Sequence, residues 1–445
     1  MLKIGPDIAY VKRIGIKGDK ERTPEAQPIL SNRKLRNQKL KTKPLNMKNK
    51  SIHESKKMKM KTLHEMTFAN GISLPSTLLC SAALALACVA AGAKQNHDND
   101  DYRAINLVSD IAGVGQVQDT NLVNGWGISY HDTFPFWVSD NGTGVTTLYA
   151  VTNDASGAPH ASIVPASAIG NGGGGAAIVS IPGNGTATGQ VANNTAGFNG
   201  DIFLFVSEDG TISGWRPGLG TAAEILASRP TAVYKGVTLA TVGTNTVLLA
   251  ANFREGTVDA YDANSQLIGQ FADSTTPAGY APFNVQAINN VVFVTFAKQD
   301  ATKQNDVSAP GRGLIDVLDP STGSFNRFAA GKRAGGKVRE MDSPWGITLA
   351  PSTFGSHANQ LLVGNLGSGT IMTFDSHGNF RGLLQGTGDC PVTIDGLWGL
   401  TFGADGGVSG VSTDLYFSAG PNGYRHGLFG VIQTVQDQDN SRDRD

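Results

Sequence analysis

Cysteine is scarce in this chain of 445 residues, and its distribution limits the structural roles that cysteine can take. The three copies are Cys80, Cys88 and Cys390. The first two fall in an apolar segment that precedes the main body of the chain, so the body itself keeps only Cys390. A lone cysteine predicts that the body has no internal disulfide, and no CxxC spacing of a zinc site occurs.

Charged residues are also few, at 16% of the chain, and they are unevenly placed. Residues 1–66 carry 18 basic and 6 acidic side chains, residues 67–93 carry none, and residues 94–445 carry 18 basic and 31 acidic ones. The formal net charge of -1 is therefore an average over a basic segment and an acidic body. An acidic body disfavours nucleic acid and anionic membranes as partners. Its hydrophobic content of 40% and its 56 glycines predict a compact fold with many tight turns.

The uncharged segment has the layout of a secretory signal peptide. A basic stretch around Lys56 and Lys61 precedes an apolar run over residues 72–90, and residues 91–93 provide a small-x-small cleavage site. The apolar run is too short and too rich in Ala and Ser to predict a stable membrane span. The sequence thus predicts a secreted or periplasmic protein. Lipoprotein anchoring through Cys88 is the less favoured alternative.

A signal peptide normally lies within about the first thirty residues, whereas this one follows a long basic stretch. Translation from Met58 or Met60 would explain the offset. We therefore expect four segments. Residues 1–57 form a basic leader that is non-native or disordered, and residues 58–93 form the signal peptide. Residues 94–435 form the folded body, a six-bladed propeller as argued below, and residues 436–445 form a charged disordered tail.

The body shows little helical periodicity and repeats one short element. Three copies read Trp-Gly followed by an aliphatic residue, and they begin at Trp126, Trp345 and Trp398. Three weaker copies bring the total to six, roughly 50 residues apart; they surround Gly189, Gly236 and Asn284. Short apolar or alternating runs follow each copy and are separated by Gly, Asn and Asp, as in β-strands joined by turns.

A four-stranded unit repeated six times predicts an all-β fold, the six-bladed β-propeller. A small glycine on each innermost strand would let the blades converge, and the aromatic residue beside it would fill the wedge between neighbours. The last repeat lacks an outer strand. Residues 104–108 are suited to supply it, so we expect an N-terminal strand to join the last blade and close the ring.

Several of these segments resemble a poorly characterised family of secreted bacterial six-bladed propellers, with a plan like that of NHL-like and lyase-like propellers. The resemblance covers roughly residues 103–433, and it rests on segments 121–128, 207–215, 250–254, 281–285, 297–301, 343–347 and 394–400. It implies the propeller fold. It carries over no activity, because none is established for the family.

One face of the predicted propeller is the candidate ligand-binding face. Because strands alternate in direction within a blade, the loops entering the innermost strands share a face with the loops between second and third strands, and loops often carry binding residues. The candidates on this face are Asn124, Asp140, Glu208, Asn252, Arg254, Lys298, Asp300, Asp342 and Asn365. Asp and Asn are also common in tight turns, so each residue has a structural alternative.

Two classes of function fit such a face. The first is a monomeric binding module that holds a small molecule, glycan, peptide or protein at the polar channel mouth. The second is a metal-assisted lyase or lactone hydrolase, with His426, Arg425 and Asp395 as candidate catalytic residues. The second class rests on fold analogy, which does not fix function. Convergence of His426 and Asp395 with another titratable group would favour it.

No cofactor is identified from the sequence. Ca²⁺ needs about six to eight oxygen ligands, which the acids and carbonyls of this face could provide, and it stays an open alternative although no EF-hand loop is present. The histidines are scattered along the chain, so no zinc site is predicted.

Overall fold

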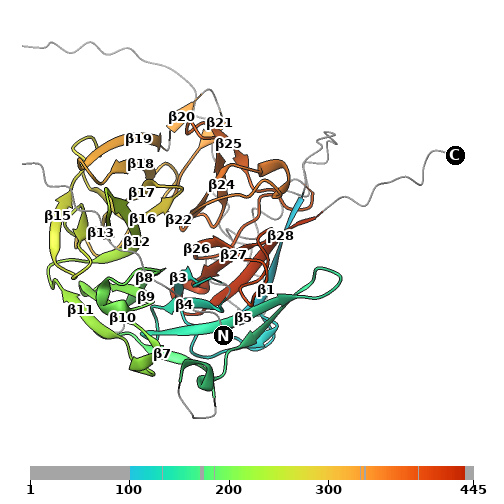
Figure 1. Cartoon of the computed structure of the whole chain (residues 1–445). Helices are drawn as coiled ribbons and strands as arrows, with labels where there is room; N and C mark the ends of the chain where they lie inside the picture. The colour runs from blue at the N-terminus through green and yellow to red at the C-terminus, as the bar shows by residue number, and fades with distance from the viewer. Residues whose placement is uncertain are drawn as a thin grey trace, which may run out of the picture. The chain divides into compact units, whose positions relative to one another are not determined.

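The computed structural model describes residues 101–435, apart from short gaps at residues 133, 171–174, 185, 331, 335–336 and 389. The predicted leader, signal peptide and tail lie outside the described residues. Six blade-like sheets are arranged around a central axis (Figure 1). The prediction of an all-β, six-bladed propeller is therefore confirmed.

The first three blades run outwards from the axis, strand by strand. Blade 1 consists of β3 (Gly125–Ser129), β4 (Phe136–Asp140), β5 (Val145–Asn153) and β6 (Pro159–Ile163), and β7 (Ile178–Ser180) pairs with β5. Blade 2 consists of β8 (Ala187–Ala192), β9 (Phe203–Ser207), β10 (Thr211–Trp215) and β11 (Glu224–Ser228). Blade 3 consists of β12 (Tyr234–Val242), β13 (Asn245–Asn252), β14 (Thr257–Tyr261) and β15 (Leu267–Phe271).

The next two blades follow the same plan. Blade 4 consists of β16 (Tyr280–Ile288), β17 (Val291–Lys298), β18 (Gly313–Asp319) and β19 (Ser324–Ala330). A hairpin of β20 (Lys332–Ala334) and β21 (Lys337–Arg339) then leads to blade 5. Blade 5 consists of β22 (Pro344–Leu349), β23 (Leu361–Asn365), β24 (Ile371–Phe374) and β25 (Phe380–Leu383).

The sixth blade is built from both ends of the propeller sequence. It contains β26 (Leu397–Phe402), β27 (Leu415–Ala419), β28 (Leu428–Val435), β1 (Asp101–Ser109) and β2 (Val117–Gln118). β1 pairs antiparallel with β28, and Ala104 lies opposite Ile432. The predicted closure is confirmed. The N-terminal strand β1 joins the last blade and pairs with β28, which would otherwise have an unpaired outer edge.

Helical segments are short connections between strands. They are η1 (Ala166–Ile169), η2 (Phe198–Gly200), η3 (Pro217–Leu219), η4 (Gly355–His357) and α2 (Pro421–Tyr424). In the part of the chain that the structure describes, no helix combines the length and the hydropathy that a membrane span requires.

Glycine on the inner strands lets neighbouring blades approach each other closely, as predicted. β3, β8, β12, β16, β22 and β26 contact one another in turn around the axis. A Cβ atom on Gly189 would lie 2.7 Å from the Cα atom of Gly236, and one on Gly236 would lie 2.9 Å from the Cα atom of Asn284. A Cβ atom on Gly399 would lie 2.6 Å from the carbonyl oxygen of Trp126. Any larger side chain at these positions would push adjacent blades apart.

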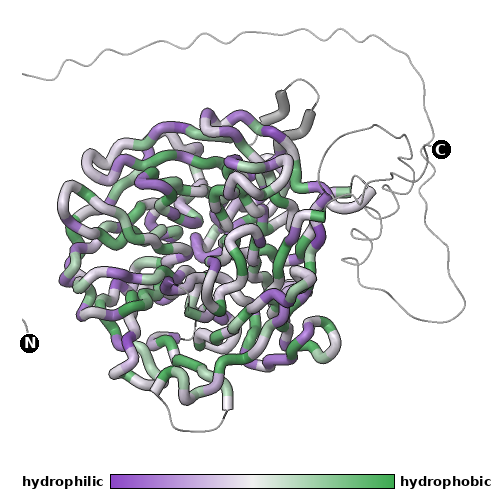
Figure 2. The backbone as a smooth tube through the Cα atoms, turned by 45° about the vertical axis from the view of Figure 1, so that its right-hand side comes forward, coloured by the Kyte–Doolittle hydropathy of each residue, from purple (hydrophilic) through white to green (hydrophobic). Residues whose placement is uncertain are grey.

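Apolar side chains fill the spaces between adjacent blades in several clusters rather than in one centre. Figure 2 shows green apolar segments distributed throughout the propeller. Between blades 1 and 2, for example, Trp137 stacks on Phe203 with ring centroids 4.1 Å apart. Each sheet therefore buries both faces against its neighbours, which one isolated sheet cannot do.

Cys390 departs from the sequence-based expectation. It is disulfide-bonded, and its partner lies outside the described residues. The expectation of a lone, unpaired cysteine is therefore wrong for the full chain, although the body contains no second cysteine with which Cys390 could form an internal disulfide. That expectation depended on removal of Cys80 and Cys88 together with the signal peptide.

Candidate functional site

Four aromatic residues close one mouth of the central channel. Trp126, Phe283, Trp345 and Trp398 directly precede the inner-strand glycine or asparagine of their blades, and they share one buried cluster, which we call the aromatic plug. Trp126 and Trp398 stack with ring centroids 3.6 Å apart, and Trp345 meets Trp398 edge-on at 5.8 Å. Behind the plug, the inner strands enclose a cavity of about 30 Å³. A ligand larger than a water molecule would therefore be recognised at the mouth and not inside the channel.

Blade 3 places a lysine at the position where three other blades have tryptophan. Lys235 precedes Gly236, and its side chain is 3% exposed. Its ammonium forms an ion pair with the Glu208 carboxylate from the β9–β10 turn. It also lies 5.0 Å from the ring centroid of Trp126 and 5.9 Å from that of Phe253. The carboxylate and the two aromatic faces compensate for the loss of water around the buried charge.

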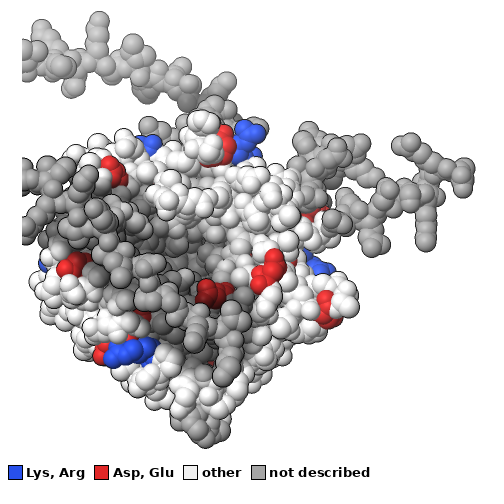
Figure 3. Space-filling view, in the orientation of Figure 1, with Lys and Arg blue, Asp and Glu red and all other residues white. Residues whose placement is uncertain are grey.

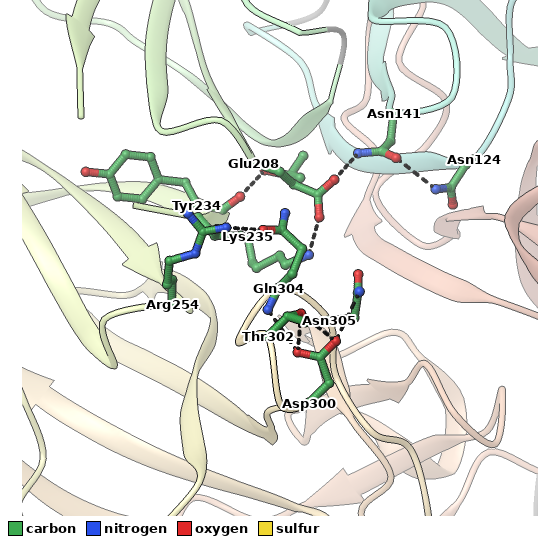
Figure 4. A network of polar contacts seen from close by, with 12 residues as sticks. Asn124, Asn141, Glu208, Tyr234, Lys235, Arg254, Asp300, Thr302, Gln304 and Asn305 are labelled. Carbon is green, nitrogen blue, oxygen red and sulfur yellow. Dashed lines mark hydrogen bonds and ion pairs between the residues drawn. The ribbon is translucent and has the colours of Figure 1, made fainter. Parts of the chain in front are cut away.

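Two asparagines of blade 1 extend this ion pair into a chain of hydrogen bonds (Figure 4). Asn141 Nδ2 donates to Glu208 Oε2 at 3.3 Å, and Asn124 Nδ2 donates to Asn141 Oδ1 at 3.1 Å. Asn124 Oδ1 in turn accepts a hydrogen bond from Trp398 Nε1 at 2.9 Å. We call Asn124, Asn141, Glu208 and Lys235 the mouth network. It connects blades 1, 2 and 3 to each other and to the aromatic plug.

The long loop between β17 and β18 reaches from blade 4 to blade 3. Arg254, in the β13–β14 turn, donates to the side-chain oxygen of Gln304 in this loop (Figure 4). Gln299, also in this loop, donates to the backbone carbonyl of Phe253. Asp300 accepts the Gln304 backbone N–H at 3.0 Å. Arg254 thus lies beside the mouth network, whereas Asp300 has the turn-forming role that was its structural alternative.

Three residues of the predicted face are fully buried within the blades. Asp140 is fully buried at the end of β4, and burial raises the pKa of its carboxyl well above the usual range. Asn252 Nδ2 donates to Asp259 Oδ2 at 3.0 Å, and Asn365 Oδ1 accepts the Asp342 backbone N–H at 3.0 Å. These contacts hold strand ends and turns together inside the blades.

Two of the candidate catalytic residues, His426 and Asp395, form hydrogen bonds with different partners. His426 Nδ1 lies 2.8 Å from Asp110 Oδ2, while Asp395 Oδ2 accepts the backbone N–H of Asn422 at 2.7 Å. Arg425 is exposed. Among residues 101–435, outside the gaps, no group of three or more His, Cys, Asp or Glu side chains is arranged to hold a metal ion. These contacts do not provide the convergence of His426 and Asp395 that would favour an enzyme.

Tyr424 marks a more acidic part of the mouth. Its side chain is 43% exposed, and its ring centroid lies 5.8 Å from that of Trp398. Partial burial, and then the negative charges of Asp306, Asp395 and Asp342, raise the pKa of its phenol. Tyr424 is therefore the accessible edge of the aromatic plug, near carboxylates that come from blades 4, 5 and 6.

Five residues of the mouth are missing from the sequence-based list of site residues: Asp110, Asn141, Lys235, Gln304 and Tyr424. Only Lys235 has a clear signal in the sequence, because it stands at the repeat position that tryptophan takes in blades 1, 5 and 6. The predicted residue Lys298 lies outside the mouth network, with its Nζ atom 5.3 Å from the ring centroid of Tyr280.

Comparisons by sequence find relatives without an assigned activity. No protein-family model matches the chain. Uncharacterized protein L690 of Acanthamoeba polyphaga mimivirus is 29% identical over 339 residues, which cover 72% of this chain and 82% of that protein. Uncharacterized protein R648 of the same virus is 27% identical over 317 residues, which cover 66% and 72%. These relatives are viral, so the bacterial source and the secretion implied by the resemblance are not supported.

Comparisons by structure find solved structures at low sequence identity. A streptogramin B lyase has a TM-score of 0.44 at 14% identity, over 77% of this chain and all of that chain. A structural genomics protein of unknown function from Bacteroides thetaiotaomicron also has a TM-score of 0.44, at 9% identity, over 75% of this chain and 76% of the other. The blade topology itself defines the class: this is a six-bladed β-propeller with one channel mouth closed by aromatic residues. The chain is similar in sequence to the mimivirus proteins, and neither comparison assigns binding or catalysis to it.

Proposed function

We propose that the protein is a ligand-binding module, that its site is the closed mouth of the propeller channel, and that its ligand is an oligosaccharide. The observation that carries this proposal is the mouth network. Asn124, Asn141, Glu208 and Lys235 converge from three blades and lie against the aromatic plug. A few fixed polar groups beside aromatic rings are usual features of a small-ligand site.

The chemistry of the mouth suits hydroxyl-rich ligands. Amide and carboxylate groups provide fixed donors and acceptors, and each sugar hydroxyl can both donate and accept. Asn141, Glu208 and Arg254 are half-buried and thus within reach of a ligand, and Tyr424 offers an exposed ring against which the apolar face of a sugar can pack. Figure 3 shows that the described part of the face in view is mostly uncharged, with scattered acidic and basic side chains.

Binding can be tested directly with neutral hexasaccharides of the cello, chito, xylo and manno series, by isothermal titration calorimetry. We expect at least one series to bind in the micromolar to millimolar range, on the order of 4–8 kcal/mol of binding free energy. Asn141→Ala and Tyr424→Ala should each weaken binding about tenfold. Asn379→Ala, in the β24–β25 turn, is the matched control and should bind like the wild type. Absence of binding in all four series, or unchanged binding by both mouth variants, would refute the proposal.

An enzymatic function is the second candidate, and the His426–Asp110 pair is the observation that favours it. A carboxylate that accepts a hydrogen bond from one imidazole nitrogen orients the ring and leaves the other nitrogen free to accept a proton. The reaction would be lyase or lactone-hydrolase chemistry. Wild-type protein and His426→Gln should be incubated with simple and macrocyclic lactones and the products analysed by mass spectrometry. A product that forms equally with both proteins would exclude His426 as the base.

Calcium binding at the carboxylates of the mouth also stays a proposal. Ca²⁺ bound to the folded state would raise the melting temperature, because a ligand that binds only the folded protein stabilises it. The measurement is a thermal melt with added Ca²⁺ and with a chelator. Identical melts in the two conditions would exclude a stabilising calcium ion.

Export is the remaining part of the proposed function. It rests on the basic stretch, apolar run and small-x-small site that end at Ala93. If the proposal holds, N-terminal sequencing of the exported protein should show a chain that begins at Lys94. An exported chain that still begins at Met1 would contradict both the signal peptide and the internal start.

A further inference from the structure

The short turn that carries Tyr424 has a left-handed backbone. Asn422 has φ 57° and ψ 47°, Gly423 has φ 65° and ψ 44°, and Tyr424 has φ 66°. Residues with a side chain avoid this conformation, and where it occurs it is normally confined to single residues. It is least expected for a bulky residue such as tyrosine. Backbone strain of this kind persists only where the surroundings hold it, and it clusters at functional sites.

Side chains from two other parts of blade 6 hold this turn at both ends. Just before β26, Asp395 Oδ2 accepts the backbone N–H of Asn422 at 2.7 Å. At the end of β1, Asp110 Oδ1 accepts the backbone N–H of Gly427 at 2.9 Å, and the Ser109 hydroxyl donates to the Gly427 carbonyl at 2.9 Å. Asp395 therefore acts on the left-handed residues themselves, whereas Asp110 and Ser109 fix the chain that follows them. A carboxylate accepts a stronger hydrogen bond than a neutral oxygen, which suits it to hold a strained backbone.

The left-handed turn places the Tyr424 ring beside both the aromatic plug and the mouth network. The ring centroid lies 5.8 Å from that of Trp398, and the residue is 43% exposed. Gly420 makes room for this arrangement, because a Cβ atom there would lie 3.1 Å from Tyr424 Cδ1 and would clash with Asn124 Oδ1. A right-handed turn would direct the ring elsewhere, because the backbone conformation sets the direction of the side chain.

We propose that Asp395 is a positioning residue. By accepting the Asn422 N–H it keeps residues 422–424 left-handed, and so it holds the Tyr424 ring in the mouth before a ligand arrives. The inference rests on the proposed function and deepens it, because this ring is the exposed apolar surface of the proposed site. A ring that is already in place loses little conformational freedom on binding. Asp395 therefore strengthens binding through Tyr424.

The first test needs no ligand. In protein labelled with fluorotyrosine, the fluorine NMR resonance of Tyr424 is identified by its absence from Tyr424→Phe. Asp395→Ala should move this resonance towards that of an exposed tyrosine, because the ring leaves Trp398. Asp395→Asn keeps an oxygen that can accept the Asn422 N–H, so it should restore the wild-type position. A resonance that stays in place in Asp395→Ala, or that moves as far in Asp395→Asn, would overturn the proposal.

Asp405→Ala is the matched control. Asp405 is another exposed aspartate of blade 6, in the β26–β27 loop, and its Oδ1 atom accepts the Ser412 backbone N–H at 2.9 Å. Its loss removes the same kind of hydrogen bond from a different turn, so the Tyr424 resonance should not move.

A glycine pair tests the turn without touching the carboxylate, and it decides the question if melting curves show that Asp395→Ala does not fold. A Cβ atom on Gly423 would meet nothing within 4 Å, so Gly423→Ala acts only through the positive φ of 65°. It should move the Tyr424 resonance in the same direction as Asp395→Ala. Gly243, in the β12–β13 turn, has φ 62° and the same open space, and Gly243→Ala should leave the resonance unchanged. No movement in Gly423→Ala would overturn the proposal.

The second test measures binding of the hexasaccharide, among the four series named above, that binds most tightly. Asp395→Ala should weaken it about tenfold, like Tyr424→Ala. The double variant should bind no more weakly than Tyr424→Ala alone, because both substitutions remove the same ring contact. Effects that multiply in the double variant would overturn the proposal in favour of a direct contact between Asp395 and the ligand. If no hexasaccharide binds, the mouth proposal fails, whereas the NMR measurement still decides the role of Asp395.

Discussion

Replacing Lys235 by methionine should destabilise the protein, mainly because the substitution leaves the negative charge of Glu208 without its ion-pair partner. Methionine keeps most of the apolar stem but removes the ammonium that pairs with Glu208. The Glu208 side chain is 13% exposed, and Asn141 Nδ2, at 3.3 Å, would be its neutral donor. Breaking a buried ion pair by removing one partner costs about 3–5 kcal/mol. Because Glu208 keeps some contact with water, we expect about 3 kcal/mol.

A double-mutant cycle separates the ion pair from simple loss of packing. Glu208→Gln alone leaves the ammonium of Lys235 buried without its anion, so it should also cost about 3 kcal/mol. The double variant Lys235→Met with Glu208→Gln removes both charges and should cost much less than the sum of the single variants. We expect a coupling energy of about 2–3 kcal/mol. Guanidinium unfolding of the four proteins measures it, provided that each unfolds in one cooperative transition.

Lys298→Met is the matched control for this cycle. The Lys298 ammonium also lies over an aromatic ring, 5.3 Å from the centroid of Tyr280, but its side chain is only partly buried. Its replacement should cost less than about 1 kcal/mol. Single and double variants that add up within about 0.5 kcal/mol would refute the reasoning, because additivity means that the two charges do not interact. A Lys235→Met variant as stable as Lys298→Met would refute it as well.

Three further predictions concern the packing, the closure and the acidity of the propeller. Gly189→Ala should cost at least about 2 kcal/mol in unfolding free energy, because its Cβ atom would lie 2.7 Å from the Cα atom of Gly236; Gly218→Ala meets nothing within 4 Å and should be nearly neutral in the same urea titration. Deletion of residues 101–109 should expose the edge of β28 and produce oligomers in light scattering, and a monodisperse deletion variant would contradict the role of β1 in closure. Asp342→Asn should remove a pH dependence: burial raises the pKa of this carboxyl from 3.8 to about 6, so the folded state holds its proton more tightly than the unfolded state. The unfolding free energy of the wild type should then fall by up to about 3 kcal/mol as the pH rises from about 4 to 6. The measurement is the melting temperature of the wild type and of Asp342→Asn at several pH values in this range. The same dependence of melting temperature on pH in both proteins would refute the assignment.

The fold could be predicted from the sequence because the channel imposes the same steric demand on every blade. Each inner strand must approach the next one closely, and glycine recurs at this position because a larger side chain would clash with the neighbouring strand. Where blade 4 has Asn284 in place of glycine, the side chain is accommodated and its Nδ2 atom donates to the Trp345 carbonyl at 2.9 Å. Elements outside the repeat, namely β7 and the β20–β21 hairpin, were not predicted, because no other blade contains a copy of them.

The site was less predictable, because the side chain of a polar residue at a strand end can either point into the blade and be buried or point towards the channel mouth. Asp140 and Asn252 end their strands on the predicted face, yet both are fully buried within the blades. Asn141 and Arg254, one and two residues further along, lie in the turns and reach the mouth. Sequence position therefore identifies the face, whereas the pleat and the turn geometry decide which neighbouring residue points to the mouth.

The chemistry of the mouth follows from the order of the blades. The three tryptophans of the plug come from blades 5, 6 and 1, which are consecutive around the closed ring, so the aromatic surface lies to one side of the axis. Blade 3 provides Lys235 at the equivalent position, on the other side, and Glu208 and Arg254 surround it. A ligand bound at the mouth would place its apolar face towards Tyr424 and its polar groups towards Glu208. A strictly repeated propeller would offer no such orientation, so the departures from the repeat, Lys235 among them, make this mouth directional.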